Sequence, residues 1–172
     1  MNSQPPDIRA LYLHHKDAIY RFVWRMTGSA SSAEDVLHDC FIALLHNRCN
    51  YNPDKAPARA FLLGMARNIA RKRWRTEQRW ALLDEENFKA DPVDPAQGEI
   101  ADLVARAVQS LPPLQREALI LFEYEELSLN EIAVAVDVEL GTVKARLHRA
   151  RENLKRMLAP IARPQRRVPI DE

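Results

Sequence analysis

Glycine and cysteine are scarce in this chain of 172 residues, which contains 4 glycines and 2 cysteines. Few glycines and 11 prolines favour helices that are separated by turns, because proline marks the ends of helices. Two cysteines do not make a disulfide framework, and Cys40 and Cys49 are not spaced as a CxxC motif. A zinc site that also used His38 and His46 is conceivable, but these side chains do not share one helical face. We therefore expect Cys40 to pack as a small apolar side chain, and we expect no metal and no cofactor.

Long apolar runs are missing as well, since none approaches the roughly 20 residues of a membrane span. The N-terminal sequence MNSQPPDIRA lacks the apolar segment of a signal peptide. A content of 47% hydrophobic and 28% charged residues is ordinary for a soluble globular protein, and the length suits one domain or two small ones. We expect a cytoplasmic protein without membrane insertion.

A net charge of +1 conceals blocks of opposite sign along the chain. Residues 58–80 include seven basic residues and a single acidic one, Glu77. Residues 81–103 include seven acidic residues and a single basic one, Lys89. Between 140 and 156, six basic residues face Glu152 alone. The two basic blocks predict polyanion contacts at two separate places, with a strong dependence on salt.

The segment from Leu127 to Leu154 has the pattern of two short amphipathic helices hinged at Asp137-Val138. Ser128 and Glu131 are spaced as a capping box, and a tight connection containing Gly141 precedes the second helix. Apolar residues recur at helical spacing in both helices, namely Leu129, Ile132, Ala133 and Val136, then Val143, Leu147, Ala150 and Leu154. Both apolar stripes can therefore face one core.

The outer side of the second of these helices is basic. At about 100° per residue, the helix directs Ala145, His148 and Arg149 away from its apolar stripe. They are flanked by Thr142, Lys144, Arg146 and Arg151. Such a face suits the DNA major groove, because arginine and lysine reach guanine edges and phosphates while a small residue permits close approach. The alternative is an ordinary solvated charged face on a helical hairpin.

Apolar spacing predicts further helices over residues 7–27, 33–47, 58–78 and 100–111, and another that begins at Pro113 or Leu114. Gly28 ends the first, and Ser31-Ser32 can cap the second. Residues 83–98 combine prolines with many acids and too little apolar periodicity for a packed element, which predicts a linker. The tail from Pro160, with its prolines and arginines, is expected to be disordered.

The helix predicted over 58–78 combines an apolar and a basic side. We expect its core side to carry Phe61, Leu62, Met65 and Ile69. Its opposite side carries Arg67, Arg71 and Trp74. An aromatic ring among arginines suits single-stranded nucleic acid, because the ring stacks on a base while guanidinium groups hold phosphates. Trp74 is equally well explained as a packing residue that covers a neighbouring helix.

Three motifs together resemble the bacterial sigma-70 family of the extracytoplasmic-function (ECF) type. Residues 111–158, including LPPLQREA, EIA and GTVKARLHRAR, are similar to its region 4. SAEDVLHDCFIALL resembles the region 2 helix that docks on the polymerase clamp, and FLLGMARNIARKRWR resembles the segment that opens and reads the −10 promoter element. The resemblance implies an all-α fold of two small helical domains: region 2 over 7–80, a flexible acidic linker over 81–98, region 4 over 99–158, and a disordered tail over 159–172.

The resemblance also assigns three sets of site residues. The −35 element would be read by Lys144, Ala145, His148 and Arg149, with Thr142, Arg146 and Arg151 completing the surface. The −10 strand would be held by Arg67, Asn68, Arg71, Lys72, Arg73, Trp74 and Arg75. The polymerase clamp would bind Asp35, His38, Asp39 and Phe41. The chain departs from the family at His38-Asp39, where Gln-Glu is common, and at Arg71-Lys72-Arg73, where an acidic residue often stands.

The function that the resemblance implies is promoter selection for core RNA polymerase, in which promoter DNA is bound and no bond is made or broken. An anti-sigma factor is an expected further partner. One alternative is a free-standing helix-turn-helix regulator, which would leave the basic helix over 58–78 without a role. The other is an enzyme that uses Glu34, Asp35, His38 and Asp39 as an acid and base cluster, although no phosphate loop or nucleophile motif accompanies them.

Overall fold

The computed structural model describes residues 7–46, 51–75 and 88–162. Within these ranges the chain forms seven α-helices and no β-strand, which confirms the predicted all-α class. The helices are α1 (Ile8–Thr27), α2 (Ala30–Leu45), α3 (Ala58–Arg75), α4 (Ile100–Ser110), α5 (Pro113–Leu119), α6 (Leu129–Val136) and α7 (Leu140–Ala162). None of them is long and apolar enough to cross a lipid bilayer.

Helix α1 begins and ends where the sequence predicts. The Asp7 carboxylate accepts hydrogen bonds from the backbone N–H groups of Arg9 and Ala10, which would otherwise lack acceptors in the first turn. At the other end Gly28 takes a left-handed conformation, with φ of 70°, and its N–H donates to the carbonyl of Trp24. A Cβ atom would strain the backbone in this left-handed conformation, so glycine fits the position.

Helix α2 begins earlier than predicted. The capping residue is Ser29, whose Oγ accepts the backbone N–H of Ser32 at 3.1 Å, and the helix starts at Ala30. The prediction that Ser31-Ser32 caps this helix was wrong, because Ser29 directly follows the turn at Gly28 and already has the extended backbone of a cap. Cys40 is fully buried, which confirms its predicted packing role, whereas Cys49 lies outside the described residues.

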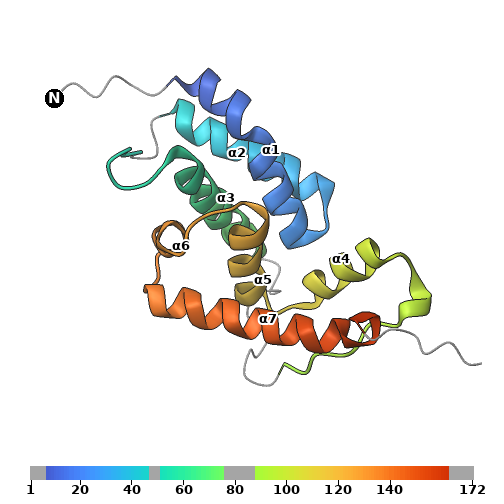
Figure 1. The fold of residues 1–172 in the computed structure, drawn as a ribbon. Helices are drawn as coiled ribbons and strands as arrows, with labels where there is room; N and C mark the ends of the chain where they lie inside the picture. The colour runs from blue at the N-terminus through green and yellow to red at the C-terminus, as the bar shows by residue number, and fades with distance from the viewer. Residues whose placement is uncertain (1–6, 47–50, 76–87, 163–172) are drawn as a thin grey trace, which may run out of the picture.

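Helix α3 is buried on more than one side. It packs against α1 and α2 on one side and against α6 on another (Figure 1). Its fully buried apolar residues are Ala60, Leu62, Leu63, Ala66 and Ala70. Phe61, Met65 and Ile69, which were predicted for the core side, are only half-buried, because the helix lies between two neighbours instead of covering one core.

Helices α4 and α5 meet at Leu111-Pro112-Pro113, as predicted. Pro113 stands in the first turn of α5, where a missing N–H does no harm. The chain then continues through a π-helical turn, η2 (Ile120–Tyr124). Ile100, which was predicted for the apolar stripe of α4, is 65% exposed because it stands at the first residue of the helix, and the stripe begins at Leu103.

The hairpin of α6 and α7 forms as predicted. Ser128 and Glu131 make the full capping box, and Asp137 turns the chain with a φ of 53°. Gly141 was predicted for the connection, but it lies in the first turn of α7, since the connection is complete by Glu139. The buried residues of α7 are Val143, Leu147, Ala150, Asn153 and Met157, and Leu154 is half-buried.

Two segments that were predicted to be flexible form ordered structure within the described residues. Residues 88–98 were predicted as an unpacked linker, but the Val93 N–H donates to the Met157 carbonyl at 2.9 Å and Pro95–Gln97 form a short helical turn. Residues 81–87 lie outside the described residues. The tail was predicted to be disordered from 159, yet α7 continues to Ala162, because Leu158 still packs against the core. Residues 163–172 lie outside the description.

The N-terminal module, α1 to α3, and the C-terminal module, α4 to α7, are in direct contact. Helix α6 lies beside α3, and α5 and η2 approach α1 (Figure 1). Buried residues from both modules form one continuous apolar cluster. The structure therefore holds in a closed arrangement the two units that the sequence predicts as separate domains.

Candidate nucleic-acid interfaces

The outer face of α7 is open to solvent. Lys144, His148 and Arg149 are exposed, while Val143 and Leu147 on the opposite side are buried. Ala145 and Thr142 are half-buried beside them. This division follows from helical spacing, which places residues three or four positions apart on one face, so Val143 and Leu147 share the inner side while Lys144 and His148 share the outer side. The face combines two cations with a small residue and is accessible to a DNA groove.

The two remaining arginines of this predicted surface are held by carboxylates. Arg151 donates from Nη2 to Oε1 of Glu123 at 2.7 Å, its guanidinium lies 5.1 Å from the Phe122 ring centre, and its side chain is 53% exposed. Arg146 is only 13% exposed, and its Nη1 lies 4.0 Å from Oε2 of Glu117. In this arrangement Arg146 is not available on the outer face.

The basic part of α3 is divided between surface and interior. Asn68, Lys72 and Arg73 are exposed, whereas Arg71 and Trp74 are half-buried. Trp74 packs against the apolar cluster, as its interpretation as a packing residue predicts. The side chain of Arg75 lies outside the described part of the structure.

Arg67 was predicted on the outer side of α3, and in this structure that placement is wrong. It is 6% exposed and makes a fork with Glu117 of α5, from Nε to Oε1 at 2.7 Å and from Nη2 to Oε2 at 3.4 Å. Its Nη1 donates to Oδ1 of Asn68 at 3.2 Å. The physical reason is that Glu117 is 1% exposed and needs a cation, so the C-terminal module draws Arg67 inward.

Burial raises the pKa of the Glu117 carboxyl above its usual value, and the positive charge of Arg67 offsets only part of this effect. A buried carboxylate is costly unless it is paired and hydrogen-bonded. Its environment therefore depends on contact with the N-terminal module.

A second buried carboxylate repeats the arrangement. Glu125 accepts from Nη2 of Arg59 at 2.7 Å, its backbone carbonyl accepts from Nε of the same arginine, and Nη1 of Arg25 lies 3.5 Å from its Oε1. The Glu125 side chain is fully buried. Both carboxylates belong to the C-terminal module, and these three arginines of α1 and α3 belong to the N-terminal one.

Side chains of the C-terminal module also cap the end of α1. Gln109 donates to the carbonyl of Arg25, and Nη1 of Arg116 donates to the carbonyl of Met26 at 2.6 Å. These carbonyls lie in the last turn of a helix, where acceptors lack partners within the helix. Burial lowers the pKa of Arg116 to about 10, which reflects how completely this contact is desolvated.

The predicted polymerase-binding residues lie on α2 and are not equally accessible. Asp35 and Asp39 have side chains that are 57% and 39% exposed, and His38 is exposed. Both carboxylates accept hydrogen bonds from Arg73 of α3, which raises the pKa of that arginine, chiefly through Asp39. Phe41 is 7% exposed, because its ring packs edge-on against Tyr12.

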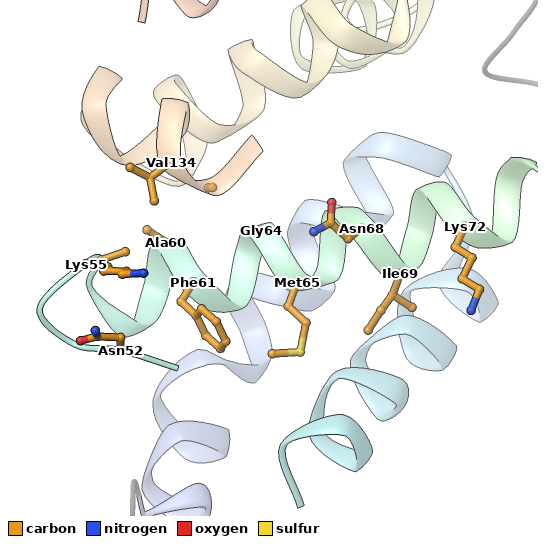
Figure 2. Close-up of a pocket in the computed structure, with 12 residues that line it drawn as sticks. Asn52, Lys55, Ala60, Phe61, Gly64, Met65, Asn68, Ile69, Lys72 and Val134 are labelled. Atoms are coloured by element: carbon orange, nitrogen blue, oxygen red, sulfur yellow. The ribbon is translucent and has the colours of Figure 1, made fainter. Parts of the chain in front are cut away.

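An apolar cavity of about 480 Å³ lies along α3, as Figure 2 shows. Phe61, Met65 and Ile69 line it from α3, Val134 and Ala135 from α6, and Lys55 and Lys72 near its edges. Gly64 lies in its wall, and a Cβ atom at Gly64 would be 2.6 Å from the carbonyl oxygen of Ala135. Only glycine permits α6 to approach this closely.

Sequence reasoning missed Glu117 and Glu125. The only signal was at Glu117, which directly precedes the apolar run ALILF, where a carboxylate is rarely buried without a partner, whereas Glu125 stands beside Glu126 and close to Glu123 in the sequence and gives no such sign. The partners are 50 and 66 residues away in sequence, so no local pattern could identify them.

Comparison with protein families gives two matches in the order of the modules. Residues 11–80 match Sigma-70 region 2, and residues 101–154 match Sigma-70 region 4. The matched residues contain the α2 carboxylates, the basic part of α3 and the outer face of α7.

Individual relatives and one solved structure agree with these matches. The chain is 33% identical to the ECF RNA polymerase sigma factor SigE of Mycolicibacterium smegmatis over 90% of its length, and it spans 62% of that protein. It is 30% identical to the ECF sigma factor SigW of Bacillus subtilis, with 84% of each chain covered. Its fold resembles that of the sigma factor RpoE from Bartonella quintana, which was solved in complex with the anti-sigma factor NepR, with a TM-score of 0.71. The two sequences are 24% identical, and the match covers 91% of this chain and 99% of RpoE.

Proposed function

The chain belongs to the sigma-70 family, and from that premise we propose that it is an ECF-type sigma factor, which binds core RNA polymerase and directs initiation at promoters with −10 and −35 elements. The family consists of specificity subunits, not enzymes, and we propose no catalytic activity for this chain. Promoter selection requires only that binding to the right DNA is favoured over binding to the wrong DNA.

The observation that carries the proposal is the exposed basic face of α7 within a helix-turn-helix. Lys144, His148 and Arg149 lie together on a helix whose apolar side is anchored by α6 and α5. A rigidly held helix with an accessible cationic face is the arrangement by which such hairpins enter a major groove. We assign the −35 element to this face, with Thr142, Ala145 and Arg151 beside it.

We assign the −10 element to α3. Lys72 and Arg73 are exposed there and supply cations for the strand, and Asn68 offers an amide that can hydrogen-bond to a base. Arg67, Arg71, Trp74 and Arg75 complete the proposed set. Strand opening needs no chemistry on this surface, because contacts to phosphates and unpaired bases offset the lost stacking.

We assign core polymerase to α2, through Asp35, His38 and Asp39, with Phe41 as a packing residue beneath them. The proposed domains are 7–80 for region 2 and 99–158 for region 4. Such a protein acts in the cytoplasm, where its polymerase is, and an anti-sigma factor is the regulatory partner that the family resemblance implies.

Transcription with purified components tests the proposal. Core polymerase is combined with the full chain and with genomic DNA of its source, and the transcripts are sequenced to locate the promoters. Initiation at a shared pair of elements is expected. Failure to bind core polymerase in a pull-down, together with unaided specific binding to duplex DNA, would support a free-standing regulator instead.

The base-reading role of Arg149 is tested on the promoters found in this way. Arg149→Ala should weaken initiation from a matched −35 element by roughly 1 to 3 kcal/mol, while a promoter already mismatched at the contacted base should lose much less. Equal loss on both promoters would contradict the assignment. Lys155→Ala provides a matched control, because Lys155 is an exposed cation six residues further along α7 that is not assigned to the −35 element.

A further inference from the structure

We propose that Glu123 is a positioning residue of the −35 surface, which holds the Arg151 guanidinium in one direction and thereby sharpens the choice between right and wrong DNA. The inference rests on the proposed function, because Arg151 belongs to the surface assigned to the −35 element. Glu123 is not among the residues that the sequence predicts for that surface. It lies on η2, 28 residues before Arg151 in the sequence.

Two neighbours hold the Arg151 side chain. Its Nε and Nη2 donate to Oε1 of Glu123 at 3.3 Å and 2.7 Å. Its guanidinium carbon lies 5.1 Å from the centre of the Phe122 ring, within the range of a cation–π contact. Since a long, exposed arginine otherwise samples many rotamers, the carboxylate and the ring together restrict the direction in which its remaining N–H groups point.

The π-helical turn places Phe122 and Glu123 next to α7. Its backbone closes with the wide spacing of a π turn, in which the Glu125 N–H donates to the Ile120 carbonyl at 3.0 Å. Ile120 and Leu121 are fully buried and fix the turn in the core. The residues that follow point outward, so Phe122 is half-buried and Glu123 is exposed. The anchor of Arg151 is therefore built into a fixed part of the C-terminal module.

Arg151 keeps donors for DNA in this contact. Its side chain is 53% exposed, and among the described residues no hydrogen bond engages its Nη1. The N–H groups of Nη1 can therefore donate to a phosphate while Glu123 keeps its hold on the other side of the guanidinium. A phosphate contact made by a side chain that is already ordered costs less entropy than one made by a side chain that must first be ordered.

The place of Arg151 along α7 indicates a phosphate contact instead of a base contact. Lys144, His148 and Arg151 follow i, i+4, i+7 spacing and form one row along the outer face. A recognition helix contacts bases with its N-terminal residues. Arg151 lies about 10 Å further along α7 than Lys144, given the rise of an α-helix. The row therefore passes from the groove toward the DNA backbone.

An arginine that a carboxylate holds affects binding to right and wrong DNA differently. Binding to wrong DNA depends mainly on how many phosphates are neutralised by cations, and Glu123 cancels one of those cations. Binding to the matched −35 element also needs phosphate contacts in one register, and an ordered Arg151 supplies one of them. Glu123 therefore weakens the first kind of complex and favours the second.

Stability does not explain the pair. The side chains of Arg151 and Glu123 are 53% and 45% exposed, and exposed ion pairs contribute little to the free energy of unfolding. Substitution of Glu123 should therefore leave the fold intact, which thermal unfolding of each variant checks. A purely structural role for Glu123 would leave the choice between DNA sequences unchanged.

Two substitutions at Glu123 separate its charge from its reach. Glu123→Gln keeps the length of the side chain but removes the charge. Glu123→Asp keeps the charge but is one methylene shorter, which withdraws the carboxylate from Arg151. Glu126→Gln is the matched control for loss of charge, because Glu126 is an exposed carboxylate of the same segment and makes no ion pair among the described residues.

The holoenzyme is measured by fluorescence anisotropy on two promoter fragments that are identical except in the −35 element, which is matched in one and scrambled in the other. The quantity compared is the ratio of the two affinities. Glu123→Gln should bind the scrambled fragment about fivefold more tightly near physiological salt, the effect of one more released counterion. Its affinity for the matched fragment should change little, because the gain in charge and the loss of order offset each other.

Glu123→Asp should bind the scrambled fragment as the wild type does. It should bind the matched fragment about threefold more weakly, which is the effect of having to order one long side chain. The ratio of the affinities therefore falls in both variants, but for different reasons, and the salt dependence on the scrambled fragment steepens only in Glu123→Gln. Glu126→Gln should leave the ratio unchanged.

Arg151→Gln tests whether Glu123 acts through Arg151. In that background neither substitution at Glu123 should alter the ratio. A ratio that stays at the wild-type value in Glu123→Gln or in Glu123→Asp would overturn the inference, and so would a ratio that still falls when Arg151 has been replaced. A wild-type holoenzyme that does not distinguish the two fragments contradicts the proposed function and this inference with it, whereas one that distinguishes them equally well without Glu123 contradicts the inference alone.

Discussion

Nη2 of Arg73 donates to Oδ2 of Asp39 at 2.6 Å, which joins the surface assigned to the promoter strand to the surface assigned to polymerase. Nη1 of the same arginine donates to Asp35 at 3.1 Å. One side chain of α3 thus pairs with both aspartates of α2. A cation of the polymerase clamp and Arg73 would compete for these oxygens, and release of Arg73 would give the DNA strand a further cation.

Arg73→Gln should weaken binding to the DNA strand while leaving the stability of the protein nearly unchanged. The three side chains are 39% to 57% exposed, and exposed ion pairs contribute about 0 to 1 kcal/mol, so the free energy of unfolding should change by less than about 1 kcal/mol. Strand binding by the holoenzyme should weaken, and the slope of log affinity against log salt should fall by about one charge. Denaturant titration and anisotropy at several salt concentrations measure these effects.

Lys72→Gln is the control for this prediction, because Lys72 is the adjacent exposed cation on α3. It should reduce the salt slope similarly, but it should leave the affinity for core polymerase unchanged. Arg73→Gln should alter that affinity, since it exposes Asp35 and Asp39. Identical polymerase affinities for the two variants would contradict the proposed competition.

The capping assignment of α2 gives a second prediction. Ser29→Ala should destabilise the protein by about 1 kcal/mol, because the Ser32 N–H loses its acceptor in the first turn. Ser31→Ala should change stability by less than about 0.5 kcal/mol, since Ser31 is exposed within the helix. Urea denaturation of both variants measures this, and a larger loss for Ser31→Ala would contradict the cap at Ser29.

Local signals of the sequence were enough for most of the fold. Capping at Ser128 and Glu131, the stop at Gly28 and the apolar stripe of α7 each depend on residues within one or two turns, so the sequence alone predicts them. The outer face of α7 was predictable for the same reason. Its exposed residues are those left over when the apolar stripe is buried.

The contact between modules could not be predicted in this way. Arg67 stands on the polar side of a helix by any local criterion, and only Glu117, 50 residues later, explains its burial. Gly64 gives no local sign that a helix from the other module approaches it. Non-local pairing also explains why α3 buries alanines where larger apolar residues were expected, because a helix between two neighbours has little room on either side.

A buried polar pair in the C-terminal module gives a third prediction. Nδ2 of Asn153 donates to Oε1 of Gln115 at 2.8 Å, and both residues are buried. Asn153→Leu should cost about 1 to 3 kcal/mol, because it leaves the Gln115 amide without its donor. Adding Gln115→Met should recover part of the loss, since an apolar pair leaves no unsatisfied group. Denaturation of the double-mutant cycle measures the coupling, and strictly additive losses would contradict it.

His15 gives the protein a stability that depends on pH. Burial, then the positive charge of Arg59, then His14 lower the pKa of His15 from its usual 6.5, and its Nδ1 has no hydrogen-bond partner among the described residues. The unfolded chain therefore takes up a proton at a higher pH than the folded one, so this contribution to stability is full above pH 6.5 and is lost as the pH falls below it. Glutamine cannot take up a proton, so the free energy of unfolding of His15→Gln should fall less steeply between pH 7 and pH 5 than that of the wild type. Above pH 7 the difference in free energy of unfolding between the two proteins should be constant. Urea denaturation at a series of pH values measures both slopes, and equal slopes below pH 6.5 would show that burial beside Arg59 does not control the titration of His15.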